Sequence, residues 1–341
     1  MDDEIVLKTE NPVNSTPGYR TAMPQNRPES ANIYGIPVKT LGQSMSVTDL
    51  VKLVRVKQYT KNVFVFAAYI FYVEGWQTPG AIKAVLLAFA AMCCASSTTY
   101  IANDIYDIEK DRNHPVKKNR PLPSGRVPVL AAFTMAVVLL VASVVLGFLS
   151  NIQVVYGLAA YLLIQVMYNL WLRNKSVADV ACISLGFVIR VVIGALAISA
   201  HVSGWILLCT ATLALMLGFG KRRHEYILMG DDAHTSRKSL AEYTHQSLDM
   251  LVMFSATCAA LTYSVYSIES PTARSYPGII LTTPFVIYGI ARYIVIVFGS
   301  GESGEPESMV LRDPHLIVTF VGFAAAAAIG LTNVPLPFLY R

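Results

Sequence analysis

Charged side chains are scarce in this sequence. Of its 341 residues, 14% are Asp, Glu, Lys or Arg, whereas about 25% is usual in soluble globular domains. Apolar residues make up 54%, and the mean hydropathy is +0.49. So little charge is left for a water-facing surface that the composition argues against a soluble protein and indicates a membrane protein.

Disulfide and zinc patterns are also lacking. The five cysteines lie inside apolar stretches and form no CxxC motif: Cys93, Cys94, Cys182, Cys209 and Cys258. Cysteines in such surroundings behave as small buried hydrophobic residues. The N-terminal region lacks the basic segment and apolar core of a signal peptide.

The first 45 residues differ in composition from the rest. They contain five prolines and many Asn and Ser residues, and they lack an apolar run. Such a segment cannot bury enough apolar surface to fold. We predict a disordered polar tail at residues 1–45 and one membrane-embedded domain at residues 46–341.

Long apolar stretches dominate that domain. A helix needs about 20 apolar residues to cross a bilayer. Nine stretches approach this length, at residues 61–77, 81–103, 128–149, 152–172, 178–200, 204–220, 248–268, 276–298 and 315–334. The alternating pattern of barrel strands is missing, so an all-α polytopic bundle of about nine transmembrane helices is predicted.

Lys and Arg residues are distributed unevenly around these stretches. With nine spans, 22 of the 27 fall in the N-terminal segment and the loops on its side, and three fall on the opposite side. The positive-inside rule therefore predicts a cytoplasmic N-terminus and cytoplasmic long polar loops.

An acidic cluster follows the second predicted span. Asn103, Asp104, Asp107 and Asp111 recur at spacings of three and four residues, which share one face of a helix. Neighbouring carboxylates stay ionised together when a cation lies among them, and oxygen ligands suit Mg²⁺ bound to substrate phosphates. We predict all four as magnesium ligands, with the three aspartates as catalytic residues.

Basic residues come directly after the acidic cluster and suit a polyanion such as a diphosphate. Those predicted to bind substrate phosphates are Arg112, Lys117 and Arg120, with His114 beside them in the pocket. The alternative is a solvated loop whose charges pair with each other. Because the first acidic residues lie near bilayer depth, where ionisable groups are usually functional, we favour a site.

A second basic segment follows the sixth predicted span. Lys221, Arg222, Arg237 and Lys238 are predicted phosphate-binding residues, and Glu225 and Tyr243 are predicted pocket residues. The alternative for the first two is that they complement a helix C-terminus and set the topology.

Four further residues lie in or beside predicted spans. Arg190 is either a partner for a carboxylate or a phosphate ligand, and both interpretations stay open. Lys61 is a further candidate phosphate ligand, and Asn62 and Tyr168 are candidate pocket residues. Anchoring at the membrane interface is the alternative for Lys61, and packing is the alternative for Tyr168.

The string NDIYDIEKDRNHPVKKNRP, Asn103 to Pro121, resembles the first aspartate-rich motif of the UbiA superfamily of intramembrane prenyltransferases. Its fuller pattern, NDxxDxxxDRxHPxKxxRP, is similar to one branch, the decaprenyl-phosphate phosphoribosyltransferases, also called decaprenylphosphoryl-5-phosphoribose synthases. Further stretches agree with that branch: Lys61-Asn62, Gly220 to Arg222 with Glu225, Arg237 to Leu240 with Tyr243, and Gly304 to Glu307 with Leu311 and Asp313.

The resemblance implies Mg²⁺-dependent transfer of 5-phosphoribose from phosphoribosyl pyrophosphate to a polyprenyl phosphate, with release of pyrophosphate. The partners are then the donor, the lipid and the bilayer, without nucleic acid, and the product leads toward cell-wall biosynthesis. Other UbiA enzymes carry a second DxxxD motif after the sixth helix, where this sequence is basic.

The remaining alternatives come from three classes. A UbiA-type enzyme could instead move a prenyl group from a prenyl diphosphate to an aromatic, quinone or haem acceptor. A transporter would need more charges within the spans and paired broken helices. In a non-catalytic membrane scaffold, the charge clusters would only set topology.

Overall fold

The computed structural model describes residues 46–113, 116–230, 238–299 and 312–332, apart from the side chains of Glu74 and Lys238. The chain divides into two units, Met1–Ser44 and Met45–Arg341. All described residues belong to the second unit. The predicted disordered tail, residues 1–45, lies outside the described residues.

The described residues form helices and connecting segments, without a β-strand among them, which confirms the predicted all-α class. The longer α-helices are α3 (Ala81–Tyr106), α5 (Val129–Ser150), α6 (Ile152–Leu170), α7 (Ala178–Ala197), α8 (Gly204–Met229), α10 (His245–Glu269), α12 (Thr283–Gly299) and α14 (Pro314–Gly330). The short α-helices are α1 (Val47–Val54), α2 (Ala67–Phe71), α4 (Ile108–Arg112) and α11 (Pro271–Ser275). The 3₁₀ segments are η1 (Val56–Phe66), η2 (Val73–Gln77), η3 (Lys117–Asn119), η4 (Leu172–Asn174), η6 (Lys238–Leu240) and η7 (Pro277–Thr282).

Seven helical segments in the described part are long and apolar enough to span a membrane, so the predicted count of nine is not confirmed. The last predicted span corresponds to α14, which has 17 residues. The first predicted span is divided among η1, α2 and η2. A 3₁₀ segment as long as the 11-residue η1 is uncommon and marks a local constraint.

That constraint is visible where η1 meets α7. Gly194 of α7 lies directly against the backbone of Val65, and a Cβ at Gly194 would be 1.8 Å from the Val65 carbonyl oxygen. Backbone-to-backbone packing this close requires glycine. The contact fixes η1 inside the bundle, where the sequence pattern predicts a regular transmembrane helix.

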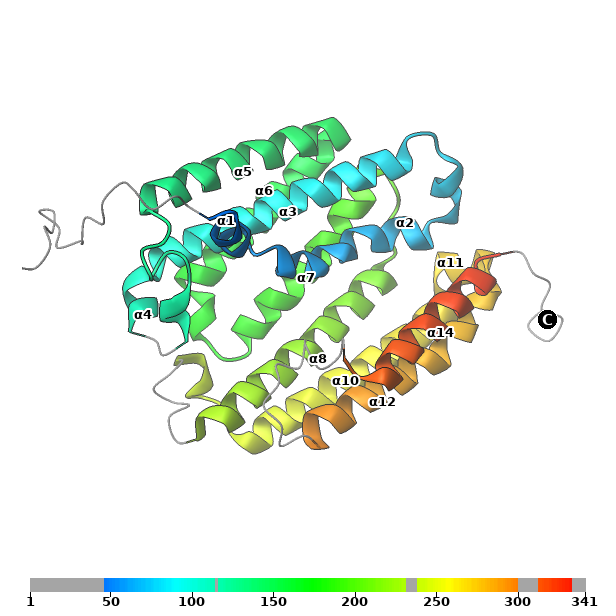
Figure 1. Ribbon diagram of the computed structural model, residues 1–341. Helices are drawn as coiled ribbons and strands as arrows, with labels where there is room; N and C mark the ends of the chain where they lie inside the picture. Colours follow the sequence, from blue (N-terminus) through cyan, green and yellow to red (C-terminus); the bar gives the residue numbers. More distant parts are fainter. Residues whose placement is uncertain (1–45, 114–115, 231–237, 300–311, 333–341) are drawn as a thin grey trace, which may run out of the picture. The chain divides into compact units, whose positions relative to one another are not determined.

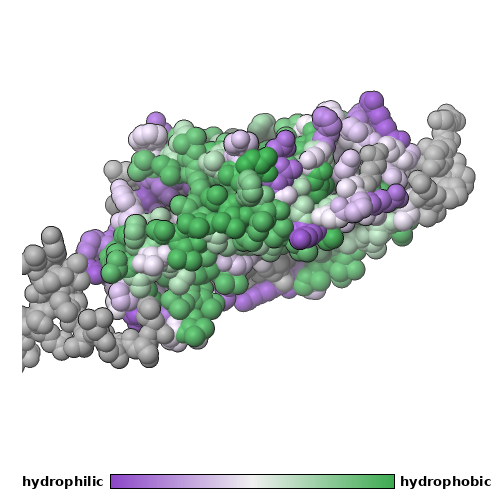
Figure 2. Space-filling model, turned by 90° about the horizontal axis from the view of Figure 1, so that it is seen from above, coloured by the Kyte–Doolittle hydropathy of each residue, from purple (hydrophilic) through white to green (hydrophobic). Residues whose placement is uncertain are grey.

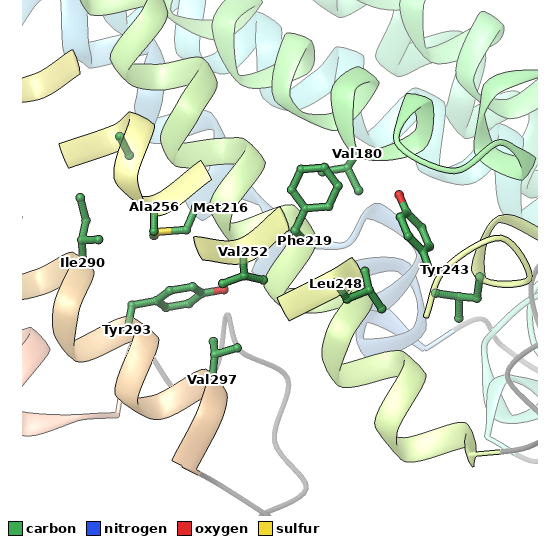
Figure 3. Close-up of a cluster of buried hydrophobic side chains, with 12 residues drawn as sticks. Val180, Met216, Phe219, Tyr243, Leu248, Val252, Ala256, Ile290, Tyr293 and Val297 are labelled. Carbon is green, nitrogen blue, oxygen red and sulfur yellow. The ribbon is translucent and has the colours of Figure 1, made fainter. Parts of the chain in front are cut away.

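The long helices pack as two groups (Figure 1). The first group comprises α3, α5, α6 and α7, and the second comprises α8, α10, α12 and α14, with α7 and α8 in contact where the groups meet. Each group has its own apolar core. One core joins η1, α3, α6 and α7 through residues between Val65 and Ala197. The other joins α8, α10 and α12, with Val180 of α7 added (Figure 3).

Helix α5 shows how the apolar sequence divides between packing and lipid. Its buried residues are small and recur on one face: Ala132, Ala136, Ser143 and Gly147. Small residues let helices approach closely in a membrane, and Ser143 donates a hydrogen bond to the Ala91 carbonyl of α3 at 2.9 Å. Large apolar side chains remain exposed, as the broad hydrophobic surface in Figure 2 shows. Such a surface fits a protein embedded in lipid.

Candidate functional site

The acidic motif lies where α3 ends. Asp104 is on the last turn of α3 and Asp111 is on α4, and their side chains are buried, with 4% and 3% of each residue exposed. Arg120 joins them, because its Nη1 donates to Asp104 Oδ1 at 3.2 Å and to Asp111 Oδ2 at 2.8 Å. The two carboxylates therefore meet at one cationic nitrogen, although they come from two successive helices.

Asp107 takes a different direction from the other two aspartates. It caps the C-terminus of α3, and its carboxylate accepts hydrogen bonds from Arg173 Nη1 at 3.0 Å and Nη2 at 3.2 Å. Helix α3 ends at Tyr106, so the single continuous face predicted for the motif is interrupted at Asp107. The structure therefore brings together two of the three predicted carboxylates and pairs the third with the segment between α6 and α7.

Two arginines at this site were missed by the sequence reasoning. Arg55 donates to Asp104 Oδ1, and its guanidinium lies 4.9 Å from the centre of the Tyr100 ring. Its backbone is left-handed, with φ 57°, which is costly for a residue other than glycine. Arg173 lies 66 residues from Asp107. Neither contact has a local spacing signal, because both depend on the tertiary fold.

The donor chemistry of the acidic motif fits a hard divalent cation. Asp104 and Asp111 already share one cationic nitrogen, and Asn103 Oδ1 is buried without a hydrogen-bond partner. Carboxylate and amide oxygens are the ligands that Mg²⁺ prefers. Among the described residues, however, no three His, Cys, Asp or Glu side chains are already grouped as a metal site. The four predicted ligands stay a prediction.

The basic residues that follow the acidic cluster can be interpreted either as a phosphate site or as a solvated loop, and the structure supports each interpretation for a different residue. Arg112 pairs with Glu109 at 2.7 Å, as the solvated-loop alternative predicts. Lys117 is half-buried in η3, where burial lowers the pKa of its ammonium group and the Asp111 carboxylate acts in the opposite direction. An ammonium group held close to the acidic motif suits a substrate anion.

The second basic segment begins on a helix. Helix α8 continues to Met229, so Lys221, Arg222 and Glu225 lie on its last turns and not in the predicted loop. Arg222 is buried, with 2% exposed, and its Nε donates to Asp179 Oδ2 at 2.8 Å while Nη1 pairs with Glu225. Two carboxylates thus offset its charge, so the structure gives Arg222 a role in joining α7 to α8.

Tyr243 connects η6 to the start of α7. Its buried hydroxyl accepts a hydrogen bond from the Val177 backbone N–H, and Ser239 donates to Asp179 Oδ2 at 3.3 Å. Val177 has φ 61°, which is strained for a β-branched residue. These contacts hold the segment around η6 against the N-terminus of α7. His114, Arg237 and the side chain of Lys238 lie outside the described residues.

Arg190 and Asn62 meet inside the first helix group. Arg190 Nε donates to Asn62 Oδ1 at 2.9 Å, and both side chains are buried. Of the two interpretations left open for Arg190, the carboxylate pair is not seen among the described residues, where its hydrogen-bond partners are an amide, a backbone carbonyl and a phenol. Lys61 and Tyr168 are half-buried on η1 and α6.

A family model for the UbiA prenyltransferase family matches residues 62–312, which is most of the chain. The chain belongs to the UbiA prenyltransferase family. The matched range begins at Asn62 and includes the acidic motif, Arg173, Arg190 and the end of α8.

Several curated relatives of this UbiA chain, matched over most of its length, share one name. The decaprenyl-phosphate phosphoribosyltransferase of Mycobacterium tuberculosis (strain ATCC 25618 / H37Rv) is 33% identical over 287 residues, which cover 83% of this chain and 94% of the relative. The enzyme of that name from Corynebacterium glutamicum is 30% identical over 334 residues and covers 96% of both chains. Another, from Mycolicibacterium smegmatis, is 32% identical over 289 residues. The family and these relatives identify the chain as a transferase.

Solved structures agree on the fold. A UbiA homolog from Archaeoglobus fulgidus bound to DMAPP and Mg²⁺ superposes with a TM-score of 0.64 at 17% identity, covering 84% of this chain and all of that one. The homolog bound to GPP and Mg²⁺ gives 0.63 at the same identity, covering 83% and 98%. The likeness supports an integral multi-pass membrane protein with the UbiA arrangement of helices.

Proposed function

We propose that this UbiA protein transfers 5-phosphoribose from phosphoribosyl pyrophosphate to a polyprenyl phosphate, such as decaprenyl phosphate, and releases pyrophosphate. The observation that carries the proposal is the similarity, over at least 90% of each relative's length, to enzymes named decaprenyl-phosphate phosphoribosyltransferase. The basic end of α8 supports it, since Lys221, Arg222 and Arg223 stand in sequence where a prenyl diphosphate enzyme would need further carboxylates.

The acidic motif would bind the pyrophosphate end of the donor through Mg²⁺. Asp104 and Asp111, which already share a cationic nitrogen, would hold the ion with Asn103 and Asp107. When bound, the ion would neutralise the charge that grows on the leaving pyrophosphate. Arg120 lies between the two carboxylates, so it is within reach of a phosphate held there.

The transfer itself needs little from the protein beyond orientation. The C1–O bond to pyrophosphate breaks, the bonding electrons leave with pyrophosphate, and an oxygen of the lipid phosphate forms the new bond to C1. Because that oxygen is already anionic, a general base is unnecessary. Positively charged side chains beside the motif, including Lys117, would hold the phosphates in line and lower the entropy cost.

The loops that carry the acidic motif and the second basic segment would face the cytoplasm, as the Lys and Arg distribution predicts. Phosphoribosyl pyrophosphate is a soluble anion, so it would meet the acidic motif from that side. The lipid phosphate would enter from the cytoplasmic leaflet with its chain in the bilayer. The charged donor would then lie at the helix end where α3 meets α4, and the acceptor would reach it from the bilayer side.

The test is a donor assay on membranes that contain the expressed protein. Labelled phosphoribosyl pyrophosphate, polyprenyl phosphate and Mg²⁺ are supplied, and label is followed into the organic phase. Label should enter the lipid, and the signal should vanish with EDTA and in Asp107→Ala. Transfer from a prenyl diphosphate to an aromatic acceptor, without transfer from phosphoribosyl pyrophosphate, would refute the proposal.

A further inference from the structure

Arg190 differs from the other arginines in the described part of the chain. The others pair with an Asp or Glu side chain, apart from Arg312, which is exposed. Arg190 is 5% exposed, lies within the spanning helix α7 and has no ion pair with a described carboxylate. Because a guanidinium stays protonated, the bundle carries a buried positive charge that its described side chains do not neutralise.

The contacts of Arg190 orient its guanidinium without offsetting its charge. Nε donates to Asn62 Oδ1 at 2.9 Å, Nη1 donates to the Gly186 carbonyl at 2.6 Å, and Nη2 lies 3.5 Å from the Tyr161 hydroxyl. Within the described part of the chain these acceptors engage three of the five N–H groups, so two are left for the oxygens of an anion. The rings of Tyr161 and Phe187, at 5.1 and 5.4 Å, attract the guanidinium but carry no net charge that would neutralise it.

The surroundings hold this arrangement firmly. Asn62 donates through Nδ2 to Ser96 Oγ at 3.1 Å and lies 3.3 Å from Cys93 Sγ, so its Oδ1 is turned toward Arg190. The Gly194 contact fixes η1 against α7, which sets the position of Asn62. A side chain at Gly186 would have its Cβ 3.3 Å from Arg190 Nη1, so glycine there leaves room for the guanidinium.

Arg190, Asn62, Ser96 and Cys93 form a polar cluster. This cluster lies further from the C-terminal end of α3 than the acidic motif does. Ser96 and Cys93 precede Asp104 by 8 and 11 residues. At 1.5 Å per residue, the cluster is about 12 to 17 Å from Asp104 along the helix axis. An anionic group bound at Arg190 is therefore separate from a diphosphate at the acidic motif.

We propose that Arg190 binds the phosphomonoester of the polyprenyl acceptor, an assignment that rests on the proposed function. The guanidinium fork matches two phosphate oxygens, and a phosphate would neutralise the buried charge. A polyprenyl phosphate resides in the bilayer, so it can reach a site beside the spanning helix α7 from the lipid. The 5-phosphate of the donor has the same chemistry but arrives from water, so the test includes it as a separate ligand.

Binding is measured by native mass spectrometry of the full-length protein in detergent. The probes are undecaprenyl phosphate, undecaprenol, which lacks the phosphate, and ribose 5-phosphate. The wild type should bind undecaprenyl phosphate well above undecaprenol. Arg190→Gln should weaken phosphate-lipid binding by at least about 30-fold and leave undecaprenol binding unchanged, because a buried charge pair would be lost.

Two further variants separate the loss of charge from the loss of bidentate geometry and from a general effect of removing an arginine. Arg190→Lys retains the charge and loses the bidentate fork, so its affinity for the phosphate lipid should fall between those of the wild type and Arg190→Gln. Arg292→Gln removes another arginine of the spanning helices, one that pairs with Asp313 at 2.7 Å, and should leave lipid binding unchanged. If Arg190→Gln fails to fold, the comparison of Arg190→Lys with the wild type decides the result.

Three outcomes would overturn the inference. Wild-type preference for the phosphate lipid in the Arg190 variants would make the arginine a packing residue. Loss of ribose 5-phosphate binding, with lipid binding intact, would assign Arg190 to the donor. An equal loss in Arg292→Gln would show a general charge effect. Arg190-dependent lipid-phosphate binding without phosphoribosyl transfer would refute the proposed reaction and leave this site standing.

Discussion

Replacing Asp104 with asparagine is the most direct test of the acidic motif. Asp104 is buried at the end of α3 and accepts hydrogen bonds from both Arg55 and Arg120. Asparagine keeps the shape of the side chain and removes one negative charge. If Asp104 helps to hold the ion that stabilises the leaving pyrophosphate, the transfer rate should fall about 10²- to 10³-fold, as when one preorganised electrostatic group is removed.

The same substitution should cost somewhat less in folding. Arg120 keeps Asp111 as a partner at 2.8 Å, and Arg55 keeps the Tyr100 ring at 4.9 Å. Both arginines also retain partial access to solvent. We therefore expect a loss of about 2 kcal/mol, the range for a hydrogen bond to a charged group, which thermal unfolding in detergent can check.

The assay follows labelled phosphoribosyl transfer as a function of Mg²⁺ concentration, with Asp49→Asn as the matched control. Asp49 is also buried and pairs with Arg126 at 3.0 Å, but it lies on α1 outside the motif. Asp49→Asn should keep the wild-type rate and magnesium response. An Asp104→Asn enzyme with wild-type rate and magnesium response would refute the reasoning, as would an equal loss in the control.

Three further substitutions test the fold around the site. Gly194→Ala should destabilise the protein by about 3 kcal/mol, measured by thermal unfolding, because its Cβ would overlap the Val65 carbonyl and backbone cannot yield easily. Asp179→Asn should cost about 3 kcal/mol by the same measurement, since it removes a buried partner of Arg222; an unchanged midpoint would contradict that role. Asp313→Asn should lower the unfolding midpoint only slightly near neutral pH, because the Arg292 side chain is partly exposed and an exposed ion pair contributes little. The Arg292 hydrogen bond lowers the pKa of Asp313, so its contribution is complete above the unfolded pKa of about 3.9 and is lost as pH falls through the folded pKa. The difference between wild type and Asp313→Asn should therefore disappear on acidification.

Apolar length predicted most of the spanning helices, because the need to satisfy the backbone in lipid leaves few alternatives. It failed at the first span, where tertiary contact overrides local preference. A regular helix over residues 61–77 would not place Val65 against Gly194 as η1 does. The sequence shows that both segments are apolar, but it does not show that the backbone of Val65 packs directly against Gly194.

The end of α8 shows a second limit. An apolar window stops at the first charged residue, so residues 204–220 were predicted as the span, whereas the helix continues through six polar or charged positions to Met229. Arg222 and Arg223 remain helical because Asp179 of α7 and Asp249 of α10 neutralise them. Both partners are distant in sequence, so the boundary could not be read locally.

The candidate site was predictable in its residue types and only partly in its geometry. Asp104 and Asp111 do converge, at Arg120, but they do so from two helices and not from the single helical face that the spacing predicted. Spacing could not show that α3 ends at Tyr106 or that Asp107 pairs with Arg173. Arg55 and Arg173 come from distant segments, and a periodic pattern carries no information about such partners.

The two separate cores bear on how the chain is made. The core of the first helix group draws its buried residues from Val65 to Ala197, and that of the second draws from Val180 to Val297. Domains generally fold as units during synthesis, N-terminal first. The first group can therefore complete its core in the membrane while α10 and α12 are still being translated. Helix α7 then offers Val180 as a docking point, so biogenesis would proceed as two successive insertions joined at one helix pair.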